Sequence, residues 1–265
     1  MSPSVNLNMK FTIAVLPMLV LGCLGAQVSY QGVDVARNIR IVNGEEAEDG
    51  EFPFQVSLQN GGSHFCGATV LNTEWILTAA HCIYDYDINQ YTVRAGSNNY
   101  NTGGTVHKVV QWEYHAQYQN YAYWNNDVAV VKVSPPLTYS AKVQPTVLPA
   151  DGAEPAGGAT STAIGWGNAC YQCPGIPDLQ KVSLVVYSLQ DCLSYYGEGP
   201  TNDMVCSGKP ENQQGICQGD SGGALIVDGV QIGITSWSGL PCASAPGVWT
   251  KISHYRDWIR QRSGV

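Results

Sequence analysis

The chain has 265 residues, a formal net charge of −8 at pH 7, and 44% hydrophobic but only 13% charged residues. A chain of this length can bury a large core, and its composition is that of a globular protein rather than a disordered one. The acidic balance and the lack of any basic stripe argue against nucleic acid and anionic membranes as partners.

The N-terminal segment predicts export. Lys10 precedes the apolar run FTIAVLPMLVLGCLGA, which ends in small residues near Ala26. A basic residue, an apolar run and small residues at its end describe a secretory signal peptide, here over 1–26. The alternative is a membrane anchor, but the run is shorter than the roughly 20 residues that a spanning helix needs. We therefore expect a secreted, extracellular protein without a membrane span.

The cysteines agree with export. Cys23 lies in the predicted signal, and the eight other cysteines form an even set, which implies disulfides in an exported protein. The motif CYQC at 170–173 could instead be a metal knuckle or a redox pair. Without a second CxxC or a nearby histidine, a small local disulfide is the favoured interpretation.

From residue 53 onward the sequence predicts short strands over almost its whole length. A first series is FQVSLQ, HFCGATVL, EWILTAA, YTVRAG, TVHKVVQWEY and DVAVVKV, and a second is STAIGWG, KVSLVVYS, DMVCSG, GALIV, QIGITSWS and GVWTKI. The Pro/Gly/Ala-rich segment 148–160 separates them and is the candidate linker. Within LIVDGVQIGI, Asp228-Gly229 predicts a two-residue type I′ hairpin turn. Many short strands indicate sandwiches or barrels, here two of them.

Helical spacing occurs only in HYRDWIRQR near the C-terminus, where Tyr255, Trp258 and Ile259 share one face. We therefore expect one short C-terminal helix.

The motif GDSGG, from Gly219 to Gly223, has two incompatible interpretations. It fits the nucleophile elbow of α/β-hydrolases, in which an acidic residue and a histidine follow the serine. That fold needs strands alternating with long helices, which this chain lacks. Asp228 and His254 do follow the serine, but Asp228 is used in a hairpin turn and His254 begins the helix signal. The partners of Ser221 should therefore lie upstream.

Two upstream motifs supply them. WILTAAHC places His81 at the end of an apolar strand, and NNDVAVV places Asp127 at the head of another. Together with IVNG, GWG, GDSGG, SW and PGVW in this order, they make the chain from Ile41 onward resemble a trypsin/chymotrypsin-type serine protease. The resemblance implies an all-β domain over 41–265, with two six-stranded antiparallel barrels at about 41–147 and 148–265. The active site would lie in the cleft between them.

The resemblance assigns Ser221 as nucleophile, His81 as acid and base, and Asp127 as the orienting carboxylate. A serine hydroxyl needs an adjacent base to attack at neutral pH, and histidine titrates in the right range to serve as one. The backbone N–H groups of Gly219 and Ser221 would form the oxyanion hole, where a single donor can change kcat by about 10²- to 10³-fold.

A further motif, RNIR–IVNG, implies activation by proteolysis. By resemblance, residues 27–40 are a propeptide that is removed by cleavage after Arg40. The new amine of Ile41 would then turn inward and pair with Asp220, since a buried carboxylate without a cation is costly. The cleavage requires a partner protease that cuts after arginine.

The primary specificity pocket is expected to be uncharged. By resemblance, Gly215 would stand at its base, where trypsin-type enzymes carry Asp, and Gly247 would face the same space. Chymotrypsin-like cleavage after Phe, Tyr or Leu is therefore expected. Ile216 and Ser238 add bulk and leave an elastase-like preference for smaller apolar residues as the alternative. The complete expected substrate-binding set is Gly215, Ile216, Gln218, Ser236, Trp237, Ser238 and Gly247. Within this set, the run 236–238 should pair with an extended substrate as an added strand.

The resemblance implies the disulfides Cys66–Cys82, Cys192–Cys206 and Cys217–Cys242, which leaves Cys170 to pair with Cys173. We expect no cofactor and no metal, because loop 97–105 has no carboxylate to bind calcium. Protein or peptide substrates and protein protease inhibitors are the other expected partners of a monomer. Digestion is the expected role, and a non-catalytic homologue that acts as a binding module is the competing class.

Overall fold

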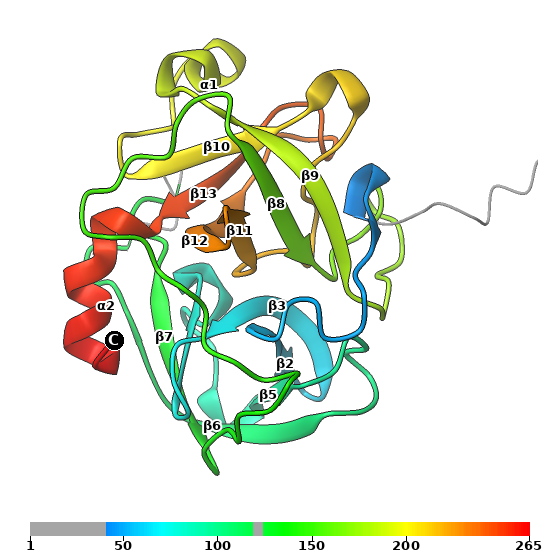
Figure 1. The fold of residues 1–265 in the computed structure, drawn as a ribbon, viewed down its shortest axis with the longest axis vertical. Coiled ribbons are helices and arrows are strands. Elements are labelled where there is room, and N and C mark those ends of the chain that lie inside the picture. Colours follow the sequence, from blue (N-terminus) through cyan, green and yellow to red (C-terminus); the bar gives the residue numbers. More distant parts are fainter. Residues whose placement is uncertain (1–40, 119–123) are drawn as a thin grey trace, which may run out of the picture. The chain divides into compact units, whose positions relative to one another are not determined.

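The computed structural model describes residues 41–118 and 124–265 (Figure 1). The predicted signal peptide at 1–26, the predicted propeptide at 27–40 and Arg40 lie outside the described residues. No helix in the described ranges is both long and apolar enough to cross a membrane.

The first barrel is a closed ring of six antiparallel strands in the order β2-β3-β4-β7-β6-β5. Its strands are Gln55–Asn60 (β2), Ser63–Val70 (β3), Trp75–Thr78 (β4), Tyr91–Ala95 (β5), Thr105–Tyr114 (β6) and Ala129–Ser134 (β7). Alternation places one face of each strand inside; in β5, for example, Tyr91, Val93 and Ala95 are buried while Thr92 and Arg94 are half-buried.

The second barrel is also a closed six-stranded ring, in the order β9-β10-β13-β12-β11-β8, with β8 pairing back to β9. Its strands are Thr160–Gly165 (β8), Gln180–Tyr187 (β9), Met204–Gly208 (β10), Ala224–Val227 (β11), Val230–Trp237 (β12) and Gly247–Lys251 (β13). The two-residue strand Glu45–Glu46 (β1) pairs with β9 from outside the ring. The expected all-β fold with two six-stranded antiparallel barrels is therefore confirmed.

The hairpin between β11 and β12 has the turn that its sequence predicts. Val227 pairs with Val230, and the two residues between them, Asp228 and Gly229, have φ angles of +48° and +78°. Positive φ at both central positions defines a type I′ turn, whose twist matches that of the flanking strands.

The expected C-terminal helix is present as α2 (Arg256–Ser263). Tyr255 and Ile259 are fully buried, and both join the core of the first barrel although they follow the last strand of the second. In Figure 1, α2 accordingly lies beside β7. The two barrels are therefore tied together through the C-terminal segment.

A second helix that was not predicted, α1 (Leu189–Tyr196), follows β9. Ser188 caps it by accepting a hydrogen bond from the N–H of Asp191, and Gly197 ends it with φ of +71°. Only Cys192 of this helix is buried. Its apolar periodicity was therefore too weak to predict it.

The structure contains four disulfides, Cys66–Cys82, Cys170–Cys173, Cys192–Cys206 and Cys217–Cys242. Cys66–Cys82, Cys192–Cys206 and Cys217–Cys242 are the pairs that the resemblance implies, and Cys170–Cys173 is the pair that was left over. Since Cys170 and Cys173 are bonded to each other, the metal-knuckle interpretation of CYQC has no free thiolates to support it.

Candidate active site

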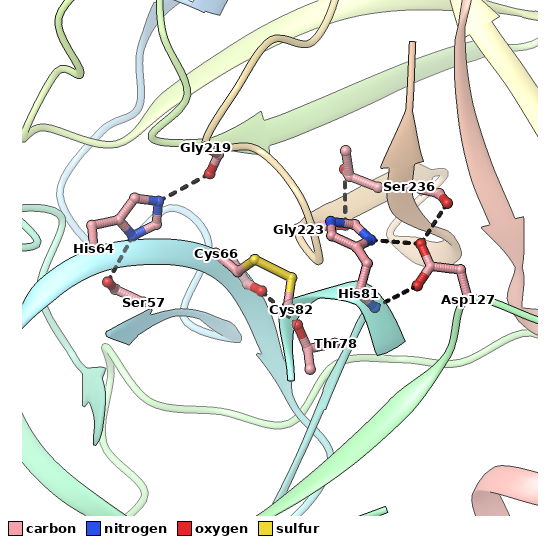
Figure 2. The surroundings of a disulfide bond; sticks show 12 residues. Ser57, His64, Cys66, Thr78, His81, Cys82, Asp127, Gly219, Gly223 and Ser236 are labelled. Atoms are coloured by element: carbon pink, nitrogen blue, oxygen red, sulfur yellow. Dashed lines mark hydrogen bonds and ion pairs between the residues drawn. A yellow bond between two sulfur atoms is a disulfide. The ribbon is translucent and has the colours of Figure 1, made fainter. Parts of the chain in front are cut away.

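Strand pairing in the first barrel brings His81 and Asp127 together. Strands β4 and β7 are antiparallel neighbours in which Thr78 pairs with Ala129. The segment just after β4 and the segment just before β7 therefore lie at the same edge of the barrel. His81 lies there in a short 3₁₀ turn, Ala80–Cys82. Nδ1 of His81 is 2.7 Å from Oδ2 of Asp127. Figure 2 marks this contact with a dashed line.

The Asp127 carboxylate is completely buried and fixed by several donors. Oδ1 accepts a hydrogen bond from the His81 backbone N–H over 2.9 Å, and Oδ2 accepts another from the Ser236 hydroxyl over 2.5 Å. The main-chain carbonyl of Asp127 accepts from Oγ1 of Thr250 over 2.8 Å. A carboxylate held in this way fixes both the position and the tautomer of the imidazole.

This contact gives Ser236 a role that sequence reasoning missed. It was expected only to pair with substrate, but its hydroxyl points from the second barrel to Asp127 of the first (Figure 2). Ser236 is the serine of the SW motif, but nothing in the local pattern of that motif indicates a contact with a residue 109 positions away.

Ser221 lies where the two barrels meet. Its carbonyl accepts a hydrogen bond from the N–H of Gly67 in β3 over 2.7 Å, while the next N–H, that of Gly222, donates to Thr235 in β12. Gly222 has φ of +77° and lies against the Gly67 carbonyl, so no side chain fits there. The N–H groups of Gly219 and Ser221 donate to no carbonyl within the described ranges and can bind an incoming oxygen.

Asp220, between those two residues, is a buried carboxylate. It is 1% exposed, and its oxygens accept hydrogen bonds from the backbone N–H groups of Gly167 and Cys217 over 2.8 and 2.9 Å. No Lys, Arg or His in the described ranges forms an ion pair with it. Burial raises the pKa of Asp220 to about 7, although the two N–H donors act in the opposite direction.

His64 is a second half-buried histidine near the site, and the sequence did not single it out. Its Nε2 is 2.9 Å from the carbonyl oxygen of Gly219, and its Nδ1 is 2.8 Å from Oγ of Ser57. Its ring stacks on Tyr100 with 5.0 Å between ring centroids. Burial lowers the pKa of His64 to about 4, so the ring is neutral at pH 7. Because the Gly219 carbonyl is bound to the His64 ring, the peptide group between Gly219 and Asp220 is held in one orientation.

One disulfide fixes both histidines. Cys66 follows His64 by two residues in β3, and Cys82 directly follows His81, so the Cys66–Cys82 bond joins the segments that carry the two rings (Figure 2). Cys66, His81 and Cys82 are also the one group of three potential metal ligands found in the described part of the chain. Both sulfurs are in the disulfide and are not available as thiolate ligands.

A cavity of about 200 Å³ opens beside Ser221, with Trp124 from the first barrel on one wall. Trp124 also stacks on His81, with ring centroids 4.4 Å apart, and is another site residue that sequence reasoning missed. The rest of the lining includes five residues expected to bind substrate, namely Ile216, Gln218, Ser236, Trp237 and Ser238, together with Leu240.

The two glycines expected in the pocket, Gly215 and Gly247, do not line this cavity. A Cβ built on Gly247 would stand 2.8 Å from Cδ1 of Ile216, and one on Gly215 would stand 3.1 Å from Cβ of Ala243. Ile216 is only 3% exposed and packs in the core of the second barrel. The space next to Gly247 is therefore filled by the Ile216 side chain.

Loop 97–105 is held by amide side chains. The Asn98 side chain donates to the carbonyls of Ala47 and Glu48, and the Asn99 side chain donates to Asp178 over 2.8 Å. The Asn98 bonds satisfy backbone carbonyls that would otherwise need another partner, and the Asn99 bond joins the loop to the Asp178 carboxylate.

Comparison with known proteins agrees with this geometry. The family model described as "Trypsin" matches residues 41–259. The chain is 33% identical over 262 residues to "Trypsin" of Phaedon cochleariae, which covers 97% of this chain and 99% of the relative. It is 36% identical over 248 residues to "Trypsin II-P29" of Gallus gallus, covering 92% and 96%.

Among solved structures, neuropsin, a serine protease expressed in the limbic system of mouse brain, is similar with a TM-score of 0.76 and 32% identity. The match covers 82% of this chain and 97% of that one. With a family match over most of its length, full-length relatives and the two-barrel fold, this chain belongs to the trypsin family of serine endopeptidases.

Proposed function

We propose that Ser221 is the nucleophile of this protease, with His81 as its acid and base and Asp127 as the orienting carboxylate. The observation that carries this is the 2.7 Å contact between Nδ1 of His81 and the fully buried Asp127. An imidazole that donates from Nδ1 has its lone pair on Nε2, which is the nitrogen that can accept a proton. Ser221 and Trp124, the residue stacked on His81, line the same cavity.

The proposed reaction has two halves. Oγ of Ser221 attacks the substrate carbonyl as His81 takes the hydroxyl proton, and the N–H groups of Gly219 and Ser221 bind the resulting oxyanion. His81 then gives its proton to the leaving amine, and the acyl group stays on Ser221. A water molecule releases the acyl group by the same steps, with His81 again serving as base and then as acid.

We propose that cleavage follows apolar residues. No carboxylate is present among the described residues that line the 200 Å³ cavity, so a buried Lys or Arg side chain would have no counter-ion there. Phe, Tyr and Leu are the expected residues before the cleaved bond. Trp237 and Leu240 supply the apolar walls.

One observation favours the elastase-like alternative. Ile216 fills the space beside Gly247, and the cavity is smaller than the roughly 300–1,000 Å³ of typical ligand pockets. The pocket is therefore shallower than its two glycines suggest. Apolar side chains smaller than Leu, such as Ala, are the second candidate class.

We also propose that the protein is made as an inactive precursor cut after Arg40. Asp220 supports this, because it is a fully buried carboxylate with no Lys, Arg or His partner in the part of the chain that the structure describes. An α-amino group on Ile41 would supply one, and Ile41 is itself fully buried in the second barrel with Ile216. Pairing of that amine with Asp220 would stabilise the Gly219–Ser221 segment on which the oxyanion hole depends.

Secretion, a monomeric state, sensitivity to protein inhibitors and a digestive role remain proposals. The predicted signal over 1–26 supports secretion, as do the four disulfides, since such bonds persist in oxidising compartments.

The test uses the purified precursor before and after cleavage by a protease specific for arginine. Sequencing should give a new N-terminus at Ile41, and hydrolysis of tetrapeptide anilides ending in Phe, Leu, Ala or Arg should appear only after the cut. Preference for Phe or Leu supports the first proposal, and preference for Ala supports the second. Efficient cleavage after Arg would refute the uncharged pocket. No activity with a correct Ile41 terminus would favour a non-catalytic binding module.

A further inference from the structure

A second cavity, of about 420 Å³, adjoins the candidate oxyanion hole. Gly219 and His64 form part of its wall, and Gln218 lines both this cavity and the 200 Å³ cavity that contains Ser221. The two cavities therefore meet at Gln218. Loop 168–175 forms another part of the wall of the 420 Å³ cavity, through Asn168 and Gly175.

If the function proposed above holds, the position of this cavity matches the half of the substrate that lies after the cleaved bond. The acyl half pairs with residues 236–238 and fills the first cavity. The reacting carbonyl lies at Ser221 and Gly219, so the half that leaves must continue past Gly219 on the side away from Ser236–Ser238. The 420 Å³ cavity begins there, and it is the space available to residues after the cleaved bond.

Loop 168–175 is closed on itself by the Cys170–Cys173 disulfide. The N–H of Cys173 also donates to the carbonyl of Cys170 over 3.1 Å. The two stems of the loop approach each other at the cavity, where a Cβ on Gly175 would stand 3.7 Å from Oδ1 of Asn168. The disulfide therefore holds together the two segments that form this wall.

The same loop is joined to the serine segment. The backbone N–H of Asn168 donates to the carbonyl of Gln218 over 2.7 Å, and the preceding N–H, from Gly167, donates to Asp220. A change in the loop can thus alter both the cavity wall and the residue that the two cavities share.

The Cys170–Cys173 bond differs from the other disulfides in its exposure. Cys170 is exposed and Cys173 is half-buried, whereas the six other bonded cysteines are all buried. A thiolate must reach a sulfur atom to exchange with it, so access decides which bond is reduced first under native conditions.

We propose that Cys170–Cys173 is a reducible clamp that controls recognition of the substrate residues after the cleaved bond. The reductant is a small dithiol. One of its thiolates attacks one sulfur of the bond, forms a mixed disulfide and releases the other cysteine as a thiolate, which takes up a proton. The second thiolate of the reductant then attacks the mixed disulfide, closes a ring and releases the second cysteine thiol. Two electrons pass to the protein, and the dithiol becomes a cyclic disulfide.

The test uses the cut, active protein with its native disulfides. It is treated briefly with dithiothreitol without denaturant, alkylated with iodoacetamide and mapped by mass spectrometry. Cys170 and Cys173 should be labelled before any other cysteine. kcat/KM is then measured for two substrates with the same acyl half: an anilide, and a quenched peptide that continues several residues beyond the cleaved bond.

The clamp predicts that kcat/KM for the extended peptide falls about 2- to 10-fold, the effect of one net hydrogen bond, while the anilide changes little. The double variant Cys170→Ser/Cys173→Ser should behave in the same way without reductant. Gln172→Gly is the matched control, since it keeps both cysteines at a position with φ of +64° that glycine adopts easily. It should leave both substrates unchanged.

Earlier labelling of another cysteine pair would overturn the proposal. So would labelling of Cys170 and Cys173 that affects neither substrate, or that affects both equally. If the double variant fails to fold, the alkylated wild-type protein still decides the question. Absence of all hydrolysis before reduction would instead refute the proposed function, and the clamp with it.

Discussion

Replacing Ser236 with alanine should slow catalysis without removing any residue of the proposed triad. The Ser236 hydroxyl donates over 2.5 Å to the same Asp127 oxygen that lies 2.7 Å from Nδ1 of His81. A hydrogen bond to a charged group contributes about 1.5–3 kcal/mol, and Asp127 keeps its two contacts with His81, which favours the lower part of that range. A loss of about 1.5–2 kcal/mol in the transition state lowers kcat/KM about 10- to 30-fold.

Thr250→Val supplies the matched control. Thr250 also donates to Asp127, over 2.8 Å, but to its main-chain carbonyl and not to its carboxylate. Both variants should lose stability in thermal unfolding, whereas only Ser236→Ala should lose most of its kcat/KM on the preferred anilide. Active-site titration corrects for inactive protein. Equal losses of activity in the two variants would refute the reasoning, since they would show that support of the carboxylate has no special role.

Three further changes test the pocket and the buried ionisable groups. Ile216→Gly should raise the ratio of kcat/KM for Phe over Ala anilides about 10-fold by opening the pocket, and an unchanged ratio would mean that another residue limits its depth. In the uncut chain, inactivated by Ser221→Ala, Asp220 has a raised pKa, so the folded state loses this proton at a higher pH than the unfolded state does. The comparison is with a second variant that also carries Asp220→Asn. In urea unfolding, the free energy of unfolding of the first variant minus that of the second should therefore fall by about 2–4 kcal/mol between pH 4 and 7, and a difference that does not change with pH would contradict the burial argument. The pKa of His64 is lowered to about 4, so the free energy of unfolding should decrease as pH falls from 6.5 to 4. His64→Phe should reduce that decrease and also lower kcat. Identical pH profiles of stability for this variant and the wild type would contradict the reasoning.

The strands were predictable because the residues within each strand, and the turn residues that bound it, are enough to predict it. The run TVHKVVQWEY coincides with β6, Thr105–Tyr114, and the Asp228-Gly229 turn follows from the chemistry of two residues. Helix α1 lacked such a signal in its apolar residues, since it buries only Cys192. Its cap was nevertheless present in the sequence, as Ser188 followed three residues later by Asp191.

Motif order indicated the residues of the proposed triad but not the residues that support them. His64 contacts Gly219 over a separation of 155 residues, and Ser236 contacts Asp127 over 109. Such pairs depend on how two barrels meet, and neither residue has neighbours in the chain that mark its role. The depth of the pocket was unpredictable for a similar reason, because the rotamer and packing of Ile216 decide it.

The placement of the last helix has a consequence for biosynthesis. Ile252, Tyr255 and Ile259 belong to the core of the first barrel, although that barrel's own strands end at Ser134. On the ribosome, the N-terminal half must therefore wait for the final residues of the chain before its interior is complete. A chain cut short before His254 would lack Tyr255 and Ile259 and would leave the interior of the first barrel incomplete.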